Sequence, residues 1–204
     1  TPELYQSTMA IIGRLGIEVV ELTAASCCGA GVLGEADPDV ALALNARTFA
    51  QAEQLGLDVM TICGTCQGVM GAANKRLKTE PGLRERINGV LAREGMTYGG
   101  TVQVKHLLWI VVREVGLQRL GEQVRVSMED FRIAPFYGCY ILRPSWDLGF
   151  DDPENPTSLE KVIRAVGGEP VAYAGRTKCC GFPIILEKEA IAVAMAGMNM
   201  KEAK

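Results

Sequence analysis

The chain has 204 residues, of which 48% are apolar, so it can bury one large core or two smaller ones and is not expected to be disordered. Its 21 basic and 24 acidic side chains give a net charge of −3, which offers no basic excess for nucleic acid. Seven cysteines are too few for a disulfide scaffold in a chain of this length. The longest charge-free stretch, residues 59–74, is too short and too polar for a membrane span. We therefore expect a soluble, cytoplasmic protein that neither binds nucleic acid nor spans a membrane.

The first half of the chain alternates between helical and extended patterns. Gly16 and Gly56 end two of the predicted helices, and Asp37 and Pro38 suit the cap and first turn of the second one. The predicted order is helix, strand, helix, strand, helix and helix, over residues 5–15, 17–22, 38–55, 57–62, a stretch after 66, and 80–95. The second strand leads directly to Cys63, and loops at strand ends build sites in α/β folds.

The second half of the chain shows weaker periodicity. Residues 151–156 read DDPENP, which we interpret as a solvated turn, with Thr157 or Ser158 as the cap of the next helix. Residues 102–115 are mostly apolar and are predicted to begin as a strand and continue as a helix. The other predicted elements are a strand, a helix, a strand and a helix over residues 131–137, 157–166, 170–173 and 187–200.

Two stretches of the chain repeat one pattern. LGIEVVELTAASCCG (15–29) and VGGEPVAYAGRTKCCG (166–181) each follow an amphipathic helix, and each combines a glycine stop, a short predicted strand and a terminal Cys-Cys-Gly. The spacing between these two stretches, applied to the other cysteines, projects a second Cys-x-x-Cys beyond Lys204 and a first lone cysteine before Thr1. The repeat therefore predicts that the natural chain is longer and carries further cysteines, unless those segments are disordered.

The cysteines are grouped, which indicates ligands rather than scattered core thiols. Thiolates bind zinc or iron–sulfur clusters when several converge, and adjacent cysteines suit an extended cluster better than two corners of a zinc tetrahedron. Nearby glycines let the backbone approach sulfur and donate hydrogen bonds to it. A thioredoxin-type redox pair at Cys63 and Cys66 and a zinc-stabilised assembly module are the alternatives. The candidate ligands are Cys27, Cys28, Cys63, Cys66, Cys139, Cys179 and Cys180.

A few other side chains could contribute to the chemistry. His106 is the only histidine, and its apolar neighbours fit a structural role as well as a functional one. Tyr137 and Tyr140 flank Cys139, where they could donate protons or hydrogen bonds or could simply pack; the same choice applies to Arg143. We take His106 and Tyr140 as the candidate catalytic residues.

Four segments resemble the B-type subunit of heterodisulfide reductase, a family with two copies of a cysteine-rich CCG domain. They are TICGTC (61–66), TVQVKHLLWIV (101–111), FYGCYILRPSWDLGFDDPENP (136–156) and KCCGFP (178–183), and the resemblance covers essentially the whole chain. It implies an α/β fold of two pseudo-symmetric, Rossmann-like halves, residues 1–125 and 126–204, with cysteine loops at strand ends. Each half is expected to hold a non-cubane [4Fe-4S] cluster with five cysteine ligands.

The resemblance assigns the cysteines to two sets. The four that precede residue 125 match ligands of the first cluster, and the three that follow it match ligands of the second. Three expected ligands are missing, so neither cluster has a full ligand set in the chain as given, and a truncated or apo form would lack the clusters. One departure from the methanogen enzymes is Tyr140, because the corresponding residue there resembles a histidine. We therefore favour the heterodisulfide reductase-like type of sulfur-oxidising bacteria.

The function that the resemblance implies is electron transfer and disulfide or thiol redox chemistry at these clusters, as an oxidoreductase acting on sulfur groups. The implied partners are a ferredoxin-like subunit and a flavoprotein subunit, and the implied substrate is a disulfide or a thiol-derived compound. The alternative for a protein with the same clusters is an electron-relay role in a complex that oxidises lactate, glycolate or succinate.

Overall fold

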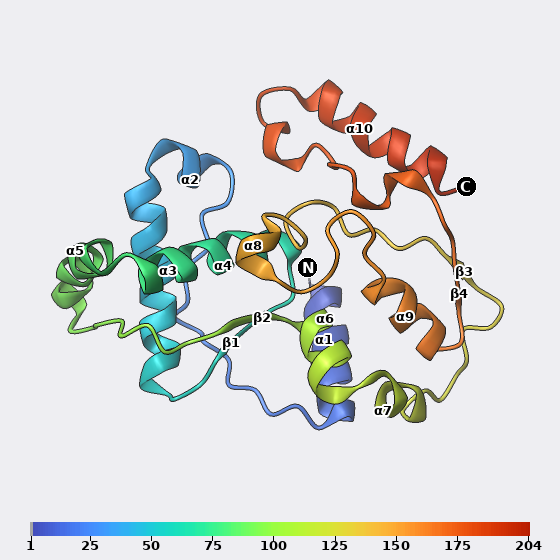
Figure 1. Ribbon diagram of the computed structural model, residues 1–204, viewed down its shortest axis with the longest axis horizontal. Helices are drawn as coiled ribbons and strands as arrows, with labels where there is room; N and C mark the ends of the chain where they lie inside the picture. The colour runs from blue at the N-terminus through green and yellow to red at the C-terminus, as the bar shows by residue number, and fades with distance from the viewer. Residues whose placement is uncertain (1) are drawn as a thin grey trace. The chain divides into compact units, whose positions relative to one another are not determined.

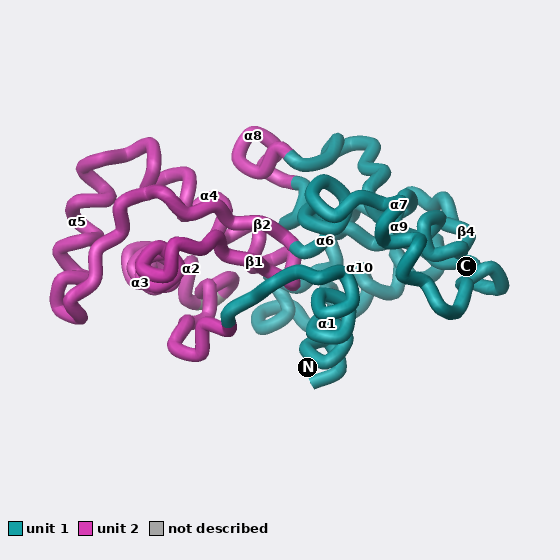
Figure 2. Tube along the Cα trace, turned by 90° about the horizontal axis from the view of Figure 1, so that it is seen from below, with its two compact units in different colours: residues 1–20, 107–142, 150–204 teal, residues 21–106, 143–149 magenta. Residues whose placement is uncertain are grey.

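The computed structural model describes residues 2–204, which form two compact units (Figures 1 and 2). Unit 2 consists of Glu21–His106 and Arg143–Gly149. Unit 1 consists of residues 2–20, Leu107–Leu142 and Phe150–Lys204. The units thus interleave along the chain, whereas the expected boundary at residue 125 follows the sequence repeat; that boundary stays a prediction.

Unit 2 is built mainly from helices around one short sheet. Its strands β1 and β2 pair in parallel, with Val59 opposite Val104 and Thr61 opposite His106. Helices α3 and α4 pack on each other, and α4 also packs on β2 and α5. Its elements are α2 (Val32–Ala36), α3 (Pro38–Gln54), β1 (Val59–Thr61), α4 (Gly64–Thr79), α5 (Pro81–Leu91), η1 (Ala92–Glu94), β2 (Val104–His106) and α8 (Ser145–Leu148).

The predicted helix after Asp37 is confirmed, and its boundaries have local causes. The Asp37 carboxylate accepts a hydrogen bond from the Val40 amide at 3.1 Å, and Pro38 occupies the first helical position, where no amide donor is needed. After the helix, Gly56 adopts a positive φ of 68°, which a residue with a Cβ rarely does. The inward face of α3 includes Ala46 and Phe49, which are fully buried.

The predicted strand over 57–62 is confirmed as the shorter β1, and it determines where Cys63 lies. Val59 and Thr61 are buried, so β1 belongs to the core of unit 2. The chain leaves β1 and enters α4 within three residues, which places Cys63 immediately before the first residue of that helix. The predicted helix over 80–95 is also confirmed, as α5 followed by the 3₁₀ turn η1.

Unit 1 is also rich in helices and contains one short parallel pair, β3 with β4, which runs side by side in Figure 1. Arg119 of α7 donates to the carbonyl oxygen of Leu15 at 2.7 Å, which links α7 to the end of α1. The elements of unit 1 are α1 (Pro2–Leu15), α6 (Leu107–Trp109), the π-helical turn η2 (Ile110–Val115), α7 (Leu117–Glu122), β3 (Arg132–Ile133), α9 (Ser158–Ala165), β4 (Glu169–Pro170), η3 (Ala174–Thr177), η4 (Phe182–Ile184) and α10 (Glu189–Glu202).

The predicted strand over residues 17–22 is wrong. The backbone hydrogen bonds of this segment are local, such as Thr23 to Glu21 and Ala25 to Leu22, and Val19 and Val20 are exposed. A strand requires a partner along its length, and no described segment pairs with this one. The predicted strands over 131–137 and 170–173 are too long, because β3 and β4 pair over only two residues each. The predicted helices over 5–15 and 187–200 are confirmed as α1 and α10.

The chain therefore has a mixed, helix-rich α/β fold. In the described residues each unit contains one two-stranded parallel sheet, and the Rossmann-like organisation of two halves that the resemblance implies stays a prediction. Within residues 2–204 we find no helix with the length and apolar character needed to cross a membrane.

Candidate cysteine sites

Four cysteines lie in unit 2, and two of them are in direct contact. The Sγ atoms of Cys28 and Cys66 are 3.5 Å apart, although the residues come from different segments. Cys28 follows an irregular segment and is buried within the core of unit 2, while Cys66 belongs to the first turn of α4. Cys27 and Cys63 are exposed. The Cys-Cys-Gly loop and the Cys-x-x-Cys helix start are therefore brought together in the folded chain.

The contact shifts the pKa values of the two thiols in opposite directions. The hydrogen bond with Cys66 lowers the pKa of Cys28 to about 6, against an opposing effect of burial, and the Ala30 amide also donates to this sulfur. The same hydrogen bond, together with burial and the negative charge on Cys28, raises the pKa of Cys66. The contact therefore favours the thiolate form of Cys28 and the thiol form of Cys66. Thiolate is the form of cysteine that attacks disulfides and binds metals.

Gln67, which sequence reasoning missed, fixes the start of α4 to both strands of unit 2. Its side chain is almost completely buried. Its Oε1 accepts a hydrogen bond from the Thr61 hydroxyl at 2.8 Å, and its Nε2 donates to the Val104 carbonyl at 3.0 Å. Because Gln67 directly follows Cys66, these two bonds tie the Cys66 backbone to the last residue of β1 and to the first residue of β2. A lone glutamine after a Cys-x-x-Cys gives no signal of this role in the sequence.

The three remaining cysteines lie in unit 1. Cys139 occupies a turn, and its pKa is raised by burial and by the neighbouring Cys179, while the Tyr140 amide stabilises its thiolate form. The Gly181 amide donates to the Cys179 sulfur at 3.4 Å. Cys179 and Cys180 therefore lie close enough to Cys139 to raise its pKa, although 40 residues separate Cys139 from Cys179. Main-chain amides reach a cysteine sulfur in both units.

Main-chain hydrogen bonds join the two cysteine-bearing segments of unit 1. The Arg176 carbonyl oxygen accepts from the Tyr137 amide at 2.8 Å and from the Gly138 amide at 3.3 Å. Tyr137 lies two residues before Cys139, and Arg176 lies three residues before Cys179. The relative placement of these cysteines is therefore set by bonds that lie just outside the cysteines themselves.

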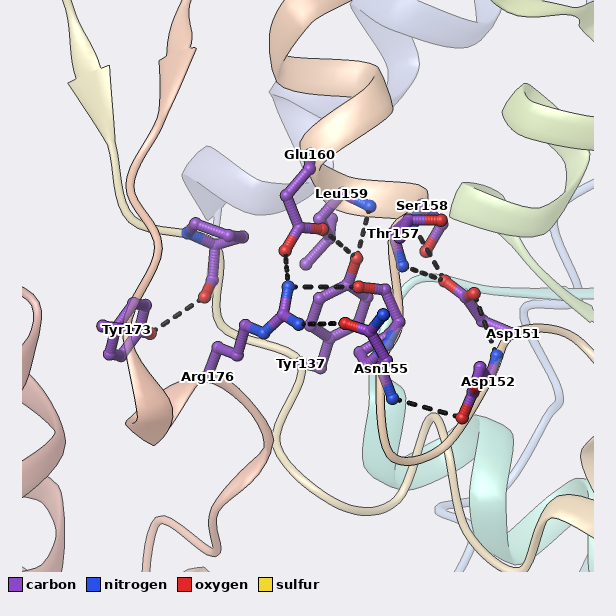
Figure 3. Close-up of polar contacts among 12 residues, drawn as sticks. Tyr137, Asp151, Asp152, Asn155, Thr157, Ser158, Leu159, Glu160, Tyr173 and Arg176 are labelled. Atoms are coloured by element: carbon purple, nitrogen blue, oxygen red, sulfur yellow. Dashed lines mark hydrogen bonds and ion pairs between the residues drawn. The ribbon is translucent and has the colours of Figure 1, made fainter.

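The side chains of the same residues form a buried cluster at the start of α9 (Figure 3). The Glu160 carboxylate accepts hydrogen bonds from the Tyr137 hydroxyl and from the Arg176 guanidinium. The guanidinium also donates to the Pro156 carbonyl at 3.1 Å and to the Asn155 side chain at 2.7 Å. Burial and the adjacent Glu160 raise the pKa of Tyr137, which keeps its hydroxyl protonated as a donor. We call Tyr137, Glu160 and Arg176 the α9 clamp.

The acidic loop that precedes α9 is more than the solvated turn predicted from its sequence. The Asp151 carboxylate accepts hydrogen bonds from the Thr157 and Ser158 amides at 3.0 and 2.9 Å, so Asp151 caps α9 (Figure 3). Thr157 occupies the N-cap position, as predicted, but its side chain makes no capping bond, and the Asp151 carboxylate binds the helix-start amides in its place. A proline-rich turn brings Asp151 back to the helix, which spacing alone does not reveal.

The two candidate catalytic residues lie in different units. His106 is the last residue of β2, and burial lowers its pKa to about 4, although a hydrogen bond with the Ile62 backbone opposes this effect. Its imidazole is therefore neutral at neutral pH. Tyr140 is half-buried and directly follows Cys139, and its amide interacts with that cysteine. A catalytic role for either side chain stays a prediction.

The donor set suits a thiolate-ligated cofactor better than a single metal ion. Each unit gathers cysteines from two separate segments, and main-chain amides already donate to Cys28 and Cys179. This is the environment that iron–sulfur clusters use. Across residues 2–204, no three histidine, cysteine, aspartate or glutamate side chains converge closely enough to hold one ion.

A family model described as the CCG cysteine-rich domain matches the chain twice, over residues 1–71 and 133–204. The first match contains the Cys-Cys-Gly and Cys-x-x-Cys motifs of unit 2, and the second contains the three cysteines of unit 1. The two matched segments together cover more than half of the chain.

Several curated proteins are similar to the chain. The 8-methylmenaquinol:fumarate reductase membrane anchor subunit of Wolinella succinogenes is 39% identical over 193 residues, which cover 95% of the chain and 66% of that protein. The B-type subunit of the ferredoxin:CoB-CoM heterodisulfide reductase of Methanosarcina mazei is 33% identical over 181 residues, or 88% of the chain and 60% of that protein. A protein of Archaeoglobus profundus that is named as similar to the heterodisulfide reductase B-type subunit is 32% identical, with 88% and 61% covered. The chain thus spans roughly 60–66% of the length of these relatives.

Proposed function

Because this chain belongs to the CCG cysteine-rich domain family, we propose that it acts as the iron–sulfur, electron-transferring subunit of a heterodisulfide reductase-like oxidoreductase. The contact between Cys28 and Cys66 carries the proposal, because it joins the two cysteine motifs of the domain at one place. Relatives named as the B-type subunit of heterodisulfide reductase, at 32–33% identity, support the same interpretation.

The proposed ligands form two sets, one in each unit. Each set would contribute to a non-cubane [4Fe-4S] cluster within a Rossmann-like half, and the boundary between halves would lie near residue 125. The chain would supply four ligands to the first cluster and three to the second. The ligand residues are Cys27, Cys28, Cys63, Cys66, Cys139, Cys179 and Cys180.

The residues around the cysteines would prepare them for this role. A bound cluster supplies one-electron steps, which allow a two-electron change at a sulfur–sulfur bond to proceed in two stages. Amides of Ala30 and Gly181 donate to the sulfur atoms of Cys28 and Cys179, as main-chain amides do around protein-bound iron–sulfur clusters. Gln67 fixes the start of α4, and the α9 clamp fixes the spacing of Cys139 and Cys179. Tyr140 would be positioned beside Cys139 to donate a proton to a departing thiolate.

The partners and substrate are proposed from the family resemblance. A ferredoxin-like subunit would deliver electrons, a flavoprotein subunit would complete the complex, and the substrate would be a disulfide or a thiol-derived compound. The complex would work in the cytoplasm. We retain the sulfur-oxidiser type of enzyme as the preferred subclass, on the basis of Tyr140.

A second candidate function has its own support. The relative with 39% identity is a subunit of a fumarate reductase, whereas the heterodisulfide reductase relatives reach 33%. In this alternative the same cysteine clusters relay electrons between a quinol and a dicarboxylic acid site on another subunit. The ligand residues are the same in both candidates, so the two differ only in the substrate of the complex.

An assay of the natural complex separates the two candidates. The complex, purified without oxygen and supplied with a reduced viologen dye, is offered a mixed disulfide or fumarate. The first proposal predicts dye oxidation with the disulfide and none with fumarate, and predicts that Cys28→Ser abolishes it. Turnover of fumarate alone would replace the first proposal with the second. Turnover of neither compound by a complex that contains iron would contradict both.

A further inference from the structure

A buried asparagine of α3 is bonded to the vicinal cysteines of unit 2. The Asn45 side chain is 2% exposed, and its Nδ2 donates to the Cys28 carbonyl at 2.9 Å and to the Ala41 carbonyl at 2.7 Å. Its Oδ1 has no hydrogen-bond partner within the described residues. An asparagine in a helix interior lowers helix stability, and an unpaired buried acceptor lowers it further. Asn45 is therefore unfavourable for α3 as a helix and useful only through its bond to the cysteine loop.

A second buried asparagine makes a similar bond in unit 1, to the first cysteine of its pair, whereas Asn45 bonds to the second cysteine of its own pair. Asn199 lies on α10, is 7% exposed, and donates through Nδ2 to the Cys179 carbonyl at 3.3 Å. Helix α10 follows the second Cys-Cys-Gly as α3 follows the first. Asn45 lies 17 residues after Cys28, and Asn199 lies 20 residues after Cys179. Both copies of the sequence repeat thus place a side-chain amide on a carbonyl of the cysteine pair.

A close contact between the helix and the glycine of the same loop accompanies each bond. At Gly29, which has a φ of 77°, an added Cβ would lie 3.2 Å from the Ala41 Cβ. At Gly181, with a φ of 88°, it would lie 2.6 Å from the Ala192 Cα. Ala41 and Ala192 are both buried. The loop and the helix after it therefore meet at a glycine–alanine contact and at an asparagine–carbonyl bond in both units.

We propose that Asn45 and Asn199 are positioning residues that hold the two vicinal cysteine pairs in the conformation required for cluster binding. Each acts through the carbonyl oxygen of a cysteine and not through its sulfur. The role rests on the proposed function, since the positioned cysteines are the proposed cluster ligands. It extends that function by assigning residues from outside the cysteine motifs to each cluster.

Thiol labelling of the metal-free chain tests the proposal without a cluster. Iodoacetamide labelling of each cysteine is followed by peptide mass spectrometry for Asn45→Ala, Asn45→Asp and Asn199→Ala. Asn45→Asp keeps the side-chain shape and removes the donor. Loss of one hydrogen bond is expected to raise Cys28 labelling about fivefold in both Asn45 variants, without changing Cys179 or Cys180. Asn199→Ala is expected to raise the labelling of Cys179 and Cys180 and to leave that of Cys28 unchanged.

Asn74→Ala is the matched control in unit 2. Asn74 is also a buried helical asparagine, but it donates to the Val102 carbonyl at 2.9 Å, away from the cysteines. Its variant is expected to leave Cys28 labelling unchanged even where it lowers the denaturation midpoint. Equal labelling of Cys28 in Asn45→Ala and wild type would overturn the proposal, as would an equal rise in Asn74→Ala. If one Asn45 variant does not fold, the other Asn45 variant and Asn199→Ala still decide.

Iron-loaded protein supplies the second readout. After anaerobic reconstitution, the Asn45 variants are expected to change the electron paramagnetic resonance spectrum of the first cluster and to lose iron to a chelator about fivefold faster than wild type. Asn74→Ala is expected to keep the wild-type spectrum. Unchanged spectra and iron loss in the Asn45 variants would overturn the proposal. Absence of iron from the natural wild-type polypeptide after the same reconstitution would contradict the proposed function, and the labelling pattern would then show by itself whether the asparagines hold the loops.

Discussion

The carbonyl oxygen of Arg176 accepts a hydrogen bond from the Tyr137 amide at 2.8 Å, which joins the segment before Cys179 to the segment before Cys139. The side chains of the same two residues meet at Glu160, so both the backbone and the side chains connect these segments. Glu160 is 8% exposed, and the carboxylate would be poorly solvated without its two partners. The α9 clamp should therefore be a strong determinant of the stability of unit 1.

Removal of the Glu160 charge should destabilise unit 1 substantially. Glu160→Gln leaves the Arg176 guanidinium without its anionic partner in a largely buried position, which should lower the free energy of unfolding by about 2–4 kcal/mol. Urea denaturation followed by tryptophan fluorescence measures this, since Trp109 is buried in unit 1. The control is Glu169→Gln, which removes an exposed ion pair with Arg132 and should cost less than about 0.5 kcal/mol. Equal losses in the two variants would show that the clamp has no special role.

Loss of the Gln67 side chain should loosen the sheet of unit 2. Gln67→Ala leaves the Thr61 hydroxyl and the Val104 carbonyl without their partner, at an expected cost of about 2–3 kcal/mol. Amide hydrogen exchange should accelerate in β1 and β2. Thr79→Ala, on the exposed side of the same helix, is the control and should leave that exchange unchanged. Protection of β1 and β2 at the wild-type level in Gln67→Ala would contradict the assigned role.

Truncation of Asp151 should have a pH-dependent effect on stability. Burial raises the pKa of Asp151, but the hydrogen bonds from Ser158 and Thr157 outweigh it, so the pKa lies below its ordinary value of 3.8. A lowered folded-state pKa stabilises the fold above that ordinary value, and the stabilisation is lost as the pH falls through the folded pKa. Asp151→Ala should therefore be less stable than wild type by about 1 kcal/mol at pH 7, as expected for a lost helix cap.

The pH series supplies the check on this assignment. The difference between wild type and Asp151→Ala should shrink once the pH drops below about 4, because the protonated carboxyl is a weaker cap. Asp130→Ala, at an exposed position before β3, is the control for the loss of a surface carboxylate. If the stability difference between wild type and Asp151→Ala stays constant from pH 7 to pH 3, the ionised Asp151 carboxylate is not the cap of α9.

The single histidine should titrate well below neutral pH. Burial lowers the pKa of His106 to about 4 from its ordinary value of 6.5, so the unfolded chain binds this proton more readily than the folded chain. Stability from neutral His106 is therefore complete above pH 6.5 and declines as the pH falls towards 4. Because His106 is the only histidine, its imidazole resonances in an NMR titration are unambiguous. A midpoint near 6.5 would contradict the buried environment and would make His106 a candidate proton donor at neutral pH again.

The elements that could be predicted from the sequence have local causes. Asp37 and Pro38 specify the start of α3, and the apolar run before Cys63 specifies β1 and the helix start that follows. The strand predicted over 17–22 fails because strand formation depends on a partner segment, which the run itself does not encode. The grouping of Cys28 with Cys66 could be anticipated from their spacing and from the family resemblance.

The residues that position the cysteines could not be predicted in this way. Glu160 and Arg176 lie 16 residues apart, and Gln67 and Val104 lie 37 residues apart, so their pairing depends on the completed fold. Asn45 and Asn199 left a partial signal, since each lies on the first long helix after a Cys-Cys-Gly. Their positions in the sequence do not indicate a role by themselves, because the role follows from the bond that each asparagine makes to a cysteine carbonyl in the folded chain.

The iron and acid-labile sulfide content of the natural polypeptide, reconstituted and purified without oxygen, tests the proposed cluster binding most directly. We predict about four iron atoms and about four sulfides for each occupied cysteine set, with little zinc. Substitution of Cys28 by serine should remove the iron of the first set and leave that of the second. Fewer than about three iron atoms per chain in every preparation, or stoichiometric zinc in their place, would contradict the assignment of these cysteines to iron–sulfur clusters.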